Sequence, residues 1–420
     1  MGSVWVVLQL LTLEHALEML QREILPIEES EWVETSDALG RILAEEVRAG
    51  DDLPPWPRST VDGFAVRARD THGASESSPV YLRMGPEVAV DDAPGGRLLP
   101  GEAWPVATGS VVPDGADAVV MLEWTSVHGQ VVEMVRPVAQ GENIIGAGED
   151  VPAGSVLVPR GRRLRAPDLG VLAAAGITRV KVLRRPRVAV LSTGDELVSP
   201  EVRDLPRGRV RDANGIMTAA RLRQEGCYVV GPRLLPDDPQ VIGQALDEAR
   251  RLDAVYVSGG TSAGSRDLVP QCLSGLSGVR VLAHGLAVKP GKPTLLAVWE
   301  GRPVVGLPGH PLSAGLVMEL VGVPAIRLRM GLDGGRRPTG ITACLASEVS
   351  NTSGRMLCVP CRLRAAGDGW LAEPLWSKSA AIGTLAVADG WFVVPAETVG
   401  LAAGSLVTVL PLAGGVGALD

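Results

Sequence analysis

Residues 254–267 read Ala-Val-Tyr-Val-Ser-Gly-Gly-Thr-Ser-Ala-Gly-Ser-Arg-Asp and carry the clearest fold signal in the chain. This stretch opens with an uninterrupted apolar run, Ala254 to Val257, which is typical of a strand buried on both faces of a parallel sheet. The glycines that follow let backbone N–H groups turn toward an anion, and the serine and threonine hydroxyls add donors. A tight strand-to-helix turn needs the same glycines. The stretch therefore predicts a buried strand followed by either a plain turn or a phosphate-binding loop.

Around this stretch the chain alternates strand-like and helix-like runs, which is typical of a domain built from βαβ units. We predict strands over residues 188–191, 228–230, 254–257, 295–298 and 304–307, and helices over 216–224, 241–251 and 312–320. The glycine loop matches neither a P-loop nor the G-x-G-x-x-G dinucleotide fingerprint. Residues 183–333 are therefore predicted to form an α/β domain with a mixed sheet and a ligand site at the strand ends.

The rest of the chain has different periodicities. Helical spacing follows a candidate N-cap, Thr12, and returns over residues 162–176. Short strand-like runs occur over residues 80–82, 88–90, 118–121 and 131–134, and again over 357–359, 392–394 and 406–409. The predicted fold class is a multidomain α/β plus β protein. Its predicted parts are a helical domain from residues 1–48 and 152–182, an inserted β domain over 49–151, the α/β domain over 183–333 and a C-terminal β barrel over 334–420.

The composition excludes several classes of protein. With 40 basic and 48 acidic residues the formal net charge is −8, which argues against a generic polyanion binder, and 3% aromatic residues supply few platforms for stacking nucleic-acid bases. Five cysteines, an odd number, indicate a reducing compartment rather than a disulfide framework. The apolar run over residues 4–11 is too short to cross a bilayer and lacks the charged flank of a signal peptide. These features predict a cytoplasmic protein with no nucleic-acid or membrane partner.

One segment departs from this acidic balance. Residues 160–187, called the basic stretch below, contain one acid, Asp168, among the basic residues Arg160, Arg162, Arg163, Arg165, Arg179, Lys181, Arg184, Arg185 and Arg187. A phosphate-binding or nucleic-acid-binding patch would have this composition. Because no stacking aromatics interleave the charges, we favour a solvated surface between domains.

Acidic residues recur at the predicted strand ends. Glu196 follows the strand over 188–191, Asp212 opens the next helix, and Asp267 closes the glycine loop. Mg²⁺ is commonly bound by one or two carboxylates together with substrate phosphates, so these acids predict a magnesium site beside a phosphate. Each of them alone would more simply be a helix cap.

Two loops of the α/β region carry side chains suited to an anion. Residues 289–293 read Lys-Pro-Gly-Lys-Pro, in which the prolines restrict the backbone that carries Lys289 and Lys292. Residues 306–314 read Gly-Leu-Pro-Gly-His-Pro-Leu-Ser-Ala, and Ser313 is placed to offer its hydroxyl to the same pocket. Two ordinary solvated loops would also fit these sequences.

Candidate residues also lie outside the α/β region. Residues 353–355 and 377–379 offer an arginine fork and hydroxyls suited to a tetrahedral oxyanion. Residues 54–65 form a proline-rich segment with Asp62 before a glycine, which is equally the pattern of a simple turn. Cys358 and Cys361 form one C-x-x-C pair without a second pair of ligands nearby, and are predicted to be ordinary buried thiols.

Seven motifs in this order resemble the molybdopterin molybdenumtransferase family known as MoeA, which includes the molybdenum-inserting half of gephyrin-like proteins. The motifs are STVDGFA (59–65), STGDEL (192–197), RDANG (211–215), SGGTSAGSRD (258–267), KPGKP (289–293), GLPGHPLSA (306–314) and SGR (353–355). The resemblance covers residues 13–409. It implies four domains, a homodimer formed through the helical domain, and a reaction that inserts the metal of molybdate into adenylylated molybdopterin and releases AMP.

The resemblance also implies roles for individual residues. Glu196, Asp212 and Asp267 would hold Mg²⁺ and handle the adenylyl phosphate, and Asp62 of the partner subunit would complete the catalytic set. The remaining positions would bind substrate, with the glycine loop cradling the pterin phosphate and the other residues forming the oxyanion site; they are Ser258, Gly259, Gly260, Thr261, Ser262, Gly264, Lys289, Lys292, Pro293, Pro308, Pro311, Ser313, Arg355 and Ser379. A doubly charged oxyanion needs fixed cations and hydroxyls, which this set supplies.

The implied partners are adenylylated molybdopterin, an oxyanion, a second copy of the chain and the molybdopterin-adenylating protein. Molybdate and tungstate are not distinguished, because both are tetrahedral dianions of nearly equal size. The alternative is a catalytically silent scaffold of the same fold, but a scaffold has no physical need for this set of charges. The chain departs from the family pattern at His310, where Asn is usual, at Phe64, where Tyr is usual, and at Ala380, where Gly is common.

Overall fold

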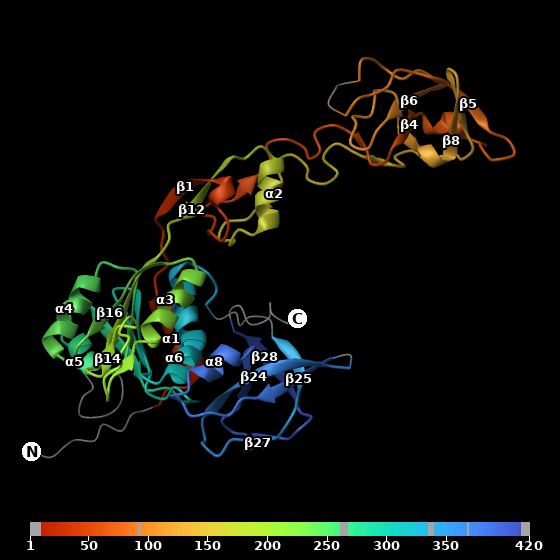
Figure 1. Ribbon diagram of the computed structural model, residues 1–420. Helices are drawn as coiled ribbons and strands as arrows, with labels where there is room; N and C mark the ends of the chain where they lie inside the picture. The colour runs from red at the N-terminus through yellow and green to blue at the C-terminus, as the bar shows by residue number, and fades with distance from the viewer. Residues whose placement is uncertain (1–9, 91–93, 261–267, 335–339, 368, 413–420) are drawn as a thin grey trace, which may run out of the picture. The chain divides into compact units, whose positions relative to one another are not determined.

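The computed structural model describes residues 10–90, 94–260, 268–334, 340–367 and 369–412 (Figure 1). Its internal contacts divide the chain into two units, one formed by Glu31–Val182 and the other by Met1–Ser30 together with Leu183–Asp420. The α/β layer and the C-terminal barrel both belong to the second unit.

A six-stranded mixed sheet forms the α/β layer. In spatial order its strands are β16 (Tyr228–Leu235), β13 (Arg187–Thr193), β17 (Ala254–Ser258), β21 (Arg302–Leu307), β20 (Leu295–Trp299) and β18 (Val279–His284). The first four run parallel, and β20 and β18 are antiparallel to their neighbours. The apolar run over 254–257 is β17, every residue of which is buried in the middle of the sheet. The predicted mixed sheet is therefore confirmed.

Helices cover both faces of this sheet (Figure 1). On one face α4 (Pro239–Ala249) and α5 (Leu268–Ser274) pack through Ile242, Leu246 and Leu273 onto alternate residues of the strands. On the other face lie α3 (Asn214–Gln224), α6 (Pro311–Val317), the π-helical turn η4 (Met318–Gly322) and α7 (Val323–Arg329). The helix predicted over 312–320 is thus α6 running into η4.

The stretch Pro311–Arg329 is the part of the described chain that is long and apolar enough to cross a membrane by length and composition. It consists of α6, η4 and α7, and 67% of its most apolar window is buried inside the protein. Tyr256, on the central strand, donates its hydroxyl hydrogen to the carbonyl oxygen of Gly322 over 2.6 Å. These contacts are those of a core helix packed on a sheet.

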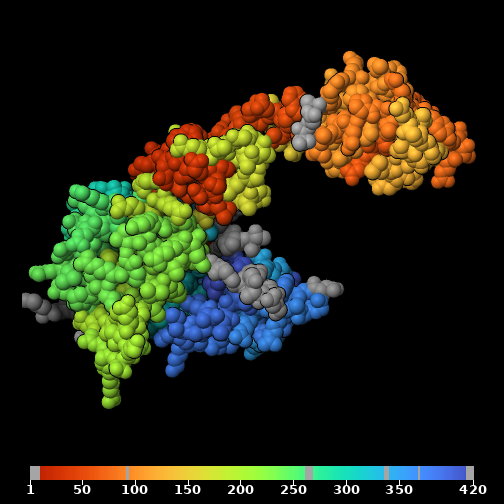
Figure 2. Space-filling view, turned by 45° about the horizontal axis from the view of Figure 1, so that its top comes forward, coloured from red at the N-terminus to blue at the C-terminus, as the bar shows by residue number. Residues whose placement is uncertain are grey.

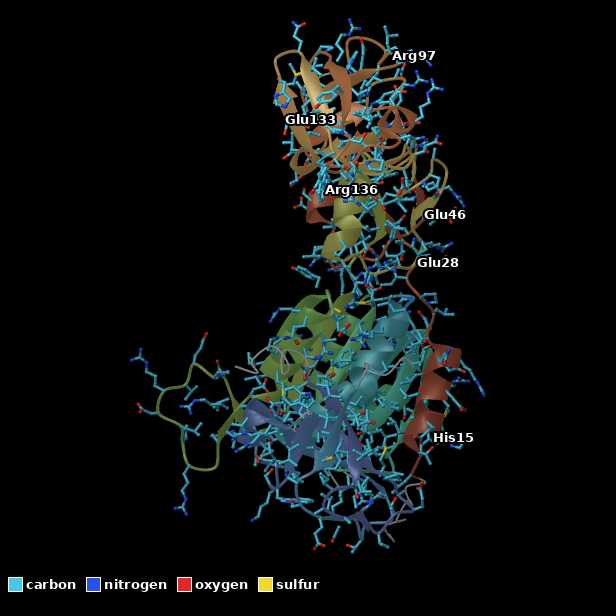
Figure 3. All side chains as sticks on the ribbon, turned by 90° about the vertical axis from the view of Figure 1, so that its right-hand side faces the viewer. His15, Glu28, Glu46, Arg97, Glu133 and Arg136 are labelled. Atoms are coloured by element: carbon cyan, nitrogen blue, oxygen red, sulfur yellow. The ribbon has the colours of Figure 1, made fainter. Side chains whose placement is uncertain are left out.

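The N-terminal helix packs with the α/β layer. Thr12 caps α1 (Leu13–Glu23) by accepting a hydrogen bond from the His15 N–H, as predicted. The buried face of α1, with Leu13 and Leu20, contacts α7, η4, β18 and β20, whereas His15 lies on its exposed face (Figure 3). From the sequence, this helix is predicted to belong to one domain with residues 152–182. That grouping is corrected because the leucine stripe of α1 finds its apolar partners on the α/β layer.

The C-terminal domain is a closed five-stranded barrel. Its strands are β22 (Ile341–Leu345), β24 (Met356–Ala366), β25 (Gly369–Pro374), β26 (Gly390–Val394) and β28 (Leu406–Pro411), with β23 (Val349–Ser350), β27 (Gly400–Leu401) and the short helix α8 (Gly383–Val387) beside them. Strand β19 (Val288–Lys289), from the α/β region, pairs with β24 in parallel and aligns Lys289 with Leu357. This pairing fixes the lysine loop against the barrel.

The unit Glu31–Val182 has its own β core. The sheet order is β7 (Ala118–Met121), β4 (Gly63–Val66), β6 (Glu102–Val106), β5 (Val80–Met84), β9 (Val131–Met134) and β8 (Thr125–His128), and β3 (Arg58–Ser59) pairs with β10 (Ile144–Ile145). The remaining elements are β1 (Ser30–Glu34) with β12 (Arg179–Leu183), β2 (Val47–Arg48) with β11 (Val156–Val158), the helix α2 (Ala166–Ala174) and the 3₁₀ turns Thr35–Asp37, Ala68–Thr71 and Leu122–Trp124. One α-helix lies among them, so residues 31–48 and 152–182 are less helical than the sequence suggested.

Two further segments differ from regular structure. The strand predicted over 88–90 is wrong. Val88 is buried but makes a single bridge to Val106, and Val90 is half exposed, so the run is neither paired along its length nor packed on both sides. The segment between β14 (Leu197–Val198) and β15 (Val210–Arg211), yellow-green in Figure 2, projects from the α/β layer with residues 203–209 exposed.

Candidate functional site

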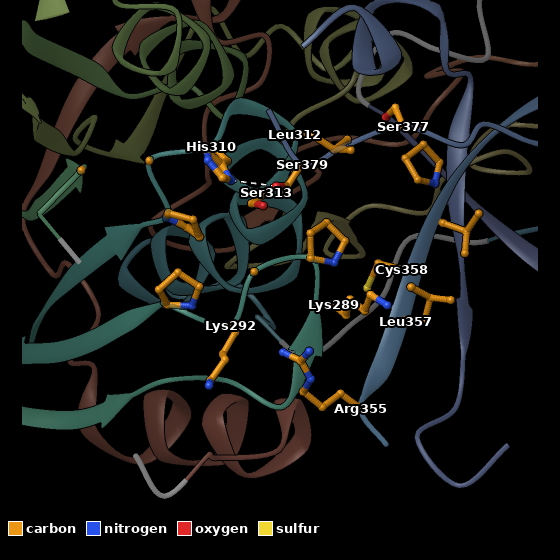
Figure 4. A pocket seen from close by; sticks show the side chains of 18 of the residues that line it. Lys289, Lys292, His310, Leu312, Ser313, Arg355, Leu357, Cys358, Ser377 and Ser379 are labelled. Atoms are coloured by element: carbon orange, nitrogen blue, oxygen red, sulfur yellow. Dashed lines mark hydrogen bonds between the residues drawn. The ribbon is translucent and has the colours of Figure 1, made fainter. Parts of the chain in front are cut away.

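A cavity of about 740 Å³ lies between the strand ends of the α/β layer and the barrel (Figure 4). The α/β layer contributes the loops that follow β13, β17 and β21 and the lysine loop after β19. The barrel contributes β24 and the segments around Arg355 and over residues 375–379. A cavity of this volume is in the range that holds a cofactor-sized ligand.

The register of the parallel strands explains why these loops converge. Ser192 of β13 aligns with Ser258 of β17, and Ser258 aligns with Leu307 of β21. The segments that follow, beginning at Thr193, Gly259 and Pro308, therefore leave the sheet side by side and line one wall. The opposite wall comes from the barrel because β19 is hydrogen-bonded to β24.

Three cations of the cavity stand without carboxylate partners. Lys289, Lys292 and Arg355 all line it, and none of them forms an ion pair within the described part of the chain. Figure 4 shows the three side chains arriving from the lysine loop and from the barrel. Positive charges that are gathered without counter-charges suit an anionic ligand.

Backbone hydrogen bonds hold two of these cations in place. The Lys292 carbonyl accepts from the N–H groups of Leu286, at 3.0 Å, and Thr294, at 2.9 Å. The Arg355 carbonyl accepts from Asn351 Nδ2 at 2.9 Å, and Asn351 is 4% exposed. The backbone that carries these two cationic side chains is therefore held by hydrogen bonds, which limits reorganisation when an anion binds.

Hydroxyl groups lie on the same walls. Ser313 is buried on α6, and Ser379 lies in the segment that follows β25. His310 Nδ1 is 2.7 Å from Ser379 Oγ, the contact dashed in Figure 4. Ser377, two residues earlier, instead accepts a hydrogen bond from the Thr384 hydroxyl at 2.7 Å. The cavity therefore combines cations with hydroxyl donors, the chemistry that a tetrahedral oxyanion needs.

The glycine turn after β17 requires glycine. Gly259 and Gly260 have φ angles of 90° and 59°, in the left-handed region, and both line the cavity. A Cβ at position 259 would lie 2.2 Å from the Thr193 carbonyl oxygen. The backbone of β13 therefore packs directly on the turn. The rest of the predicted loop, with Thr261, Ser262, Gly264 and Asp267, lies outside the described residues.

Two polar residues behind this turn were missed by the sequence analysis. Asn214, at the start of α3, donates to Ser258 Oγ and to the Gly309 carbonyl, both at 2.8 Å, and so ties three elements together. Thr193 lines the cavity while 2% exposed, and its hydroxyl has no hydrogen-bond partner in the described part of the chain. A buried hydroxyl without a partner beside a glycine turn is placed to donate to a ligand. The signal available was its position, two residues beyond the predicted strand run over 188–191.

The structure separates the predicted carboxylates. Glu196 lines the cavity. Asp212 does not: it is 4% exposed, and its oxygens accept hydrogen bonds from Ser192 Oγ and from the Gly215 N–H, each at 2.9 Å. It borders a separate hollow, and the Gly215 N–H that it accepts from belongs to the first turn of α3. A carboxylate that the sequence analysis did not name, Asp237, lines the cavity with Glu196, because it follows β16, the neighbour of β13.

The other predicted positions fall in several places. Pro293 and Pro308 line the cavity, Ser258 lies buried beneath the turn, and Pro311 is the first residue of α6 without lining the cavity. Cys358 and Cys361 are buried cysteines; Cys358 lines the cavity, and burial raises the pKa of Cys361 to about 12.

Asp62 belongs to the unit Glu31–Val182. Its exposed carboxylate accepts hydrogen bonds from the Thr108 N–H at 2.7 Å and from the Thr108 hydroxyl at 3.0 Å. The backbone bond, and then the hydroxyl, lower the pKa of Asp62 below its ordinary value. Phe64, two residues on, stands where Tyr is usual in the family that the motifs resemble. It is 3% exposed and packs in an apolar cluster, so its ring needs no hydrogen-bond partner there.

Three family models together match most of the chain. They describe a MoeA N-terminal region (domain I and II) over residues 11–176, a "Probable molybdopterin binding domain" over 189–328 and a MoeA C-terminal region (domain IV) over 342–412. The chain belongs to the MoeA family. The resemblance identified from the motifs is therefore confirmed, and so is the multidomain α/β plus β fold class.

Relatives and solved structures of this MoeA family agree. Molybdopterin molybdenumtransferase 2 of Mycobacterium tuberculosis is 35% identical over 391 residues, which are 90% of this chain and 94% of the relative. The molybdopterin molybdenumtransferase of Bacillus subtilis is 31% identical over 401 residues, 91% of this chain and 90% of the relative. A MoeA crystal structure from Pyrococcus horikoshii, named as a molybdopterin biosynthesis protein, has a TM-score of 0.83 at 29% identity and covers 96% of this chain and 100% of its own.

Proposed function

We propose that this member of the MoeA family is a molybdopterin molybdenumtransferase that inserts the metal of molybdate into adenylylated molybdopterin and releases AMP. The names of its relatives support a role in molybdenum-cofactor biosynthesis. The model described as a molybdopterin-binding domain covers the α/β layer, whose strand ends form one wall of the cavity. The identity of the second substrate and the release of AMP are our proposals.

The observation that carries this proposal is the set of unpaired cations in the cavity. Lys289, Lys292 and Arg355 supply positive charge, and Ser313 and Ser379 supply hydroxyl donors, to a cavity that is open to a doubly charged ligand. Molybdate and tungstate are both such ligands, and these donors would bind either. At the α/β wall the N–H groups of the glycine turn and the Thr193 hydroxyl are placed to hold a phosphate of the pterin substrate.

We also propose a magnesium site in the cavity, with two carboxylates from the described residues. Glu196 and Asp237 come from the carboxyl ends of adjacent strands and are hard oxygen donors of the kind that Mg²⁺ takes together with substrate phosphates. Bound there, Mg²⁺ would neutralise charge that develops on the phosphate during cleavage. Asp267 remains a predicted third carboxylate. Asp212 also remains a predicted metal ligand, although its oxygens already accept hydrogen bonds from Ser192 and Gly215.

The chain's own residues then have distinct tasks. The lysine loop and Arg355 bind and orient the oxyanion, the glycine turn positions the pterin phosphate, and the apolar wall around Leu357 and Val359 limits water at that side. Such fixed donors act by stabilising charge in the transition state rather than by forming covalent intermediates. We further propose a homodimer in which Asp62 of the partner subunit completes the site.

The test is incubation of purified protein with adenylylated molybdopterin, Mg²⁺ and molybdate or tungstate, following AMP release and metal retention. We expect AMP release that depends on Mg²⁺ and oxyanion. Asp267→Asn keeps the shape and capping ability of the side chain, so a loss of about a hundredfold in AMP release by a folded variant would support the metal role. Binding of the pterin without any AMP release would instead favour the silent scaffold.

The proposed dimer has its own test. Light scattering is expected to give twice the chain mass of 43.9 kDa. A mixed dimer that carries Asp62→Ala in one chain and Asp267→Ala in the other should recover one competent site. A monomer, or no recovery of activity, would contradict the shared site.

A further inference from the structure

His310 makes a contact that the proposed chemistry has not used. It lies in the loop between β21 and α6, and its Nδ1 is 2.7 Å from Ser379 Oγ across the cavity wall (Figure 4). These residues are far apart in the sequence and belong to the α/β layer and to the segment that follows β25. The contact therefore joins the two walls of the cavity at a hydroxyl proposed to bind the oxyanion.

The backbones of both residues are held independently of this contact. His310 is the N-cap residue of α6: its carbonyl accepts from the Ala314 N–H at 2.9 Å, and Pro311 follows at the first helical position. The Ser379 carbonyl accepts from the Leu312 N–H at 3.1 Å. The loop therefore stays in place without the imidazole, and what the imidazole adds is control over the direction of the hydroxyl.

That direction decides what Ser379 can do. A serine hydroxyl has one proton and two lone pairs. If Nδ1 accepted the proton, Ser379 would present lone pairs to an incoming anion and repel it. If Nδ1–H donates to Ser379 Oγ, the serine proton is left free to be donated to the anion.

We infer that His310 is a positioning residue that donates through Nδ1 to Ser379 and thereby aims the Ser379 hydroxyl at the oxyanion. This inference rests on the proposed function, since it requires that Ser379 contacts the oxyanion. An asparagine amide at position 310 also carries N–H donors, whereas alanine carries none. The role therefore depends on a donor at position 310, and not on imidazole as such.

Ser377 is a matched control for this inference. It lies on the same segment and lines the same cavity, but its hydroxyl is bonded to Thr384 over 2.7 Å and not to His310. If His310 acts by orienting Ser379, its removal should interact energetically with removal of the Ser379 hydroxyl. It should not interact with removal of the Ser377 hydroxyl.

The experiment is a double-mutant cycle on molybdate binding, measured by calorimetry with the full-length protein. We expect His310→Ala to weaken binding about five- to tenfold and to have no further effect in a Ser379→Ala background, since one neutral hydrogen bond is lost. In a Ser377→Ala background the effect of His310→Ala should be undiminished. His310→Asn should return the affinity to within about twofold of the parent protein, and the thermal unfolding midpoint of His310→Ala should be unchanged.

The possible outcomes separate the two proposals. If Ser379→Ala weakens binding but His310→Ala does not, or if His310→Ala weakens it equally with and without the Ser379 hydroxyl, the positioning role is wrong and the oxyanion site stands. Failure of His310→Asn to rescue binding also overturns the positioning role. If Ser379→Ala leaves molybdate binding unchanged, the proposed place of Ser379 in the oxyanion site fails, and the positioning role fails with it.

Discussion

The basic stretch and the cavity hold their positive charges in opposite ways. In the basic stretch, Asp168 accepts hydrogen bonds from Arg162 and Arg165, both at distances of about 3 Å. In the cavity, the cations of the lysine loop and Arg355 have no ion-pair partner among the described residues. The denser run of charge in the sequence is therefore the one in which several cations already have carboxylate partners.

The pairing continues toward the C-terminal end of the basic stretch. Arg179 pairs with Glu34 at 3.2 Å and Lys181 with Glu45 at 3.4 Å. The Arg184 guanidinium forms a bidentate ion pair with the Asp253 carboxylate, and Asp253 is 4% exposed. These ion pairs favour a structural surface over a phosphate-binding or nucleic-acid-binding patch in this segment. A counter-charge within reach, rather than the number of basic residues, separates structural cations from ligand-binding ones.

The largest expected effect concerns Glu225, a buried carboxylate paired with two arginines. Glu225 is 4% exposed and accepts hydrogen bonds from Arg221 and Arg327, each with a 2.8 Å contact. Glu225→Ala would leave both arginines partly uncompensated, so we expect the free energy of unfolding to fall by about 3–5 kcal/mol, measured by urea unfolding. An unchanged unfolding midpoint would contradict the expectation that the ion pairs of Glu225 stabilise the fold.

The same carboxylate makes stability depend on pH. Burial alone would raise the pKa of Glu225, but the hydrogen bonds and charges of Arg327 and Arg221 lower it from 4.5 to about 2. A depressed pKa stabilises the fold fully above the unfolded value of 4.5, and this contribution is lost as the pH falls from 4.5 toward 2. In Glu225→Gln this part of the acid sensitivity should be missing when urea unfolding is repeated between pH 6 and about pH 3.

The next effect tests the cavity carboxylates. Glu196→Gln keeps the size of the side chain and removes its charge, so we expect AMP release to fall about a hundredfold while folding is retained. Glu248→Gln is the matched control, because Glu248 is an exposed glutamate whose partner is Arg233 at 2.7 Å. Equal rates for Glu196→Gln and the parent protein would remove Glu196 from the metal site.

The unpaired cations should affect binding more than stability. Lys292→Ala or Arg355→Ala removes one charge-assisted partner of the oxyanion, which is expected to cost about 1.5–3 kcal/mol, or about ten- to a hundredfold in molybdate affinity by calorimetry. The unfolding midpoint should stay the same because no protein partner is lost. Unchanged molybdate binding in both variants would take these residues out of the oxyanion site.

The smallest effect is expected in the basic stretch itself. Arg179 and Lys181 are at least one-third exposed in their side chains, and exposed pairs contribute about 0–1 kcal/mol. Arg179→Ala and Lys181→Ala should therefore change stability by no more than this and leave molybdate affinity as it was. A clear loss of molybdate affinity in either variant would contradict the expectation that paired cations of the basic stretch do not contribute to binding.

Local patterns predicted most of the elements. The apolar runs over 188–191, 254–257 and 304–307 are strands because a parallel strand covered on both faces needs apolar residues at every position, which is a local requirement. Two predictions failed for non-local reasons. The run over 88–90 is buried at Val88 but half exposed at Val90, because no other described part of the fold covers that side. The apolar stripe of α1 packs on the α/β layer rather than on residues 152–182.

The sequence by itself determined the strand-to-turn pattern of the α/β layer, the glycine turn and the rigid lysine loop, because these depend on backbone preferences of neighbouring residues. Which side chains meet, and which charged groups line the cavity, depends on the tertiary structure. It brings Asp237 and Glu196 into the lining of one cavity, engages the Asp212 oxygens in hydrogen bonds from Ser192 and Gly215, and brings His310 Nδ1 within 2.7 Å of Ser379 Oγ. Hydrogen bonds and ion pairs join residues that are distant along the chain, so a residue's chemical availability depends on where the folded chain places its partners.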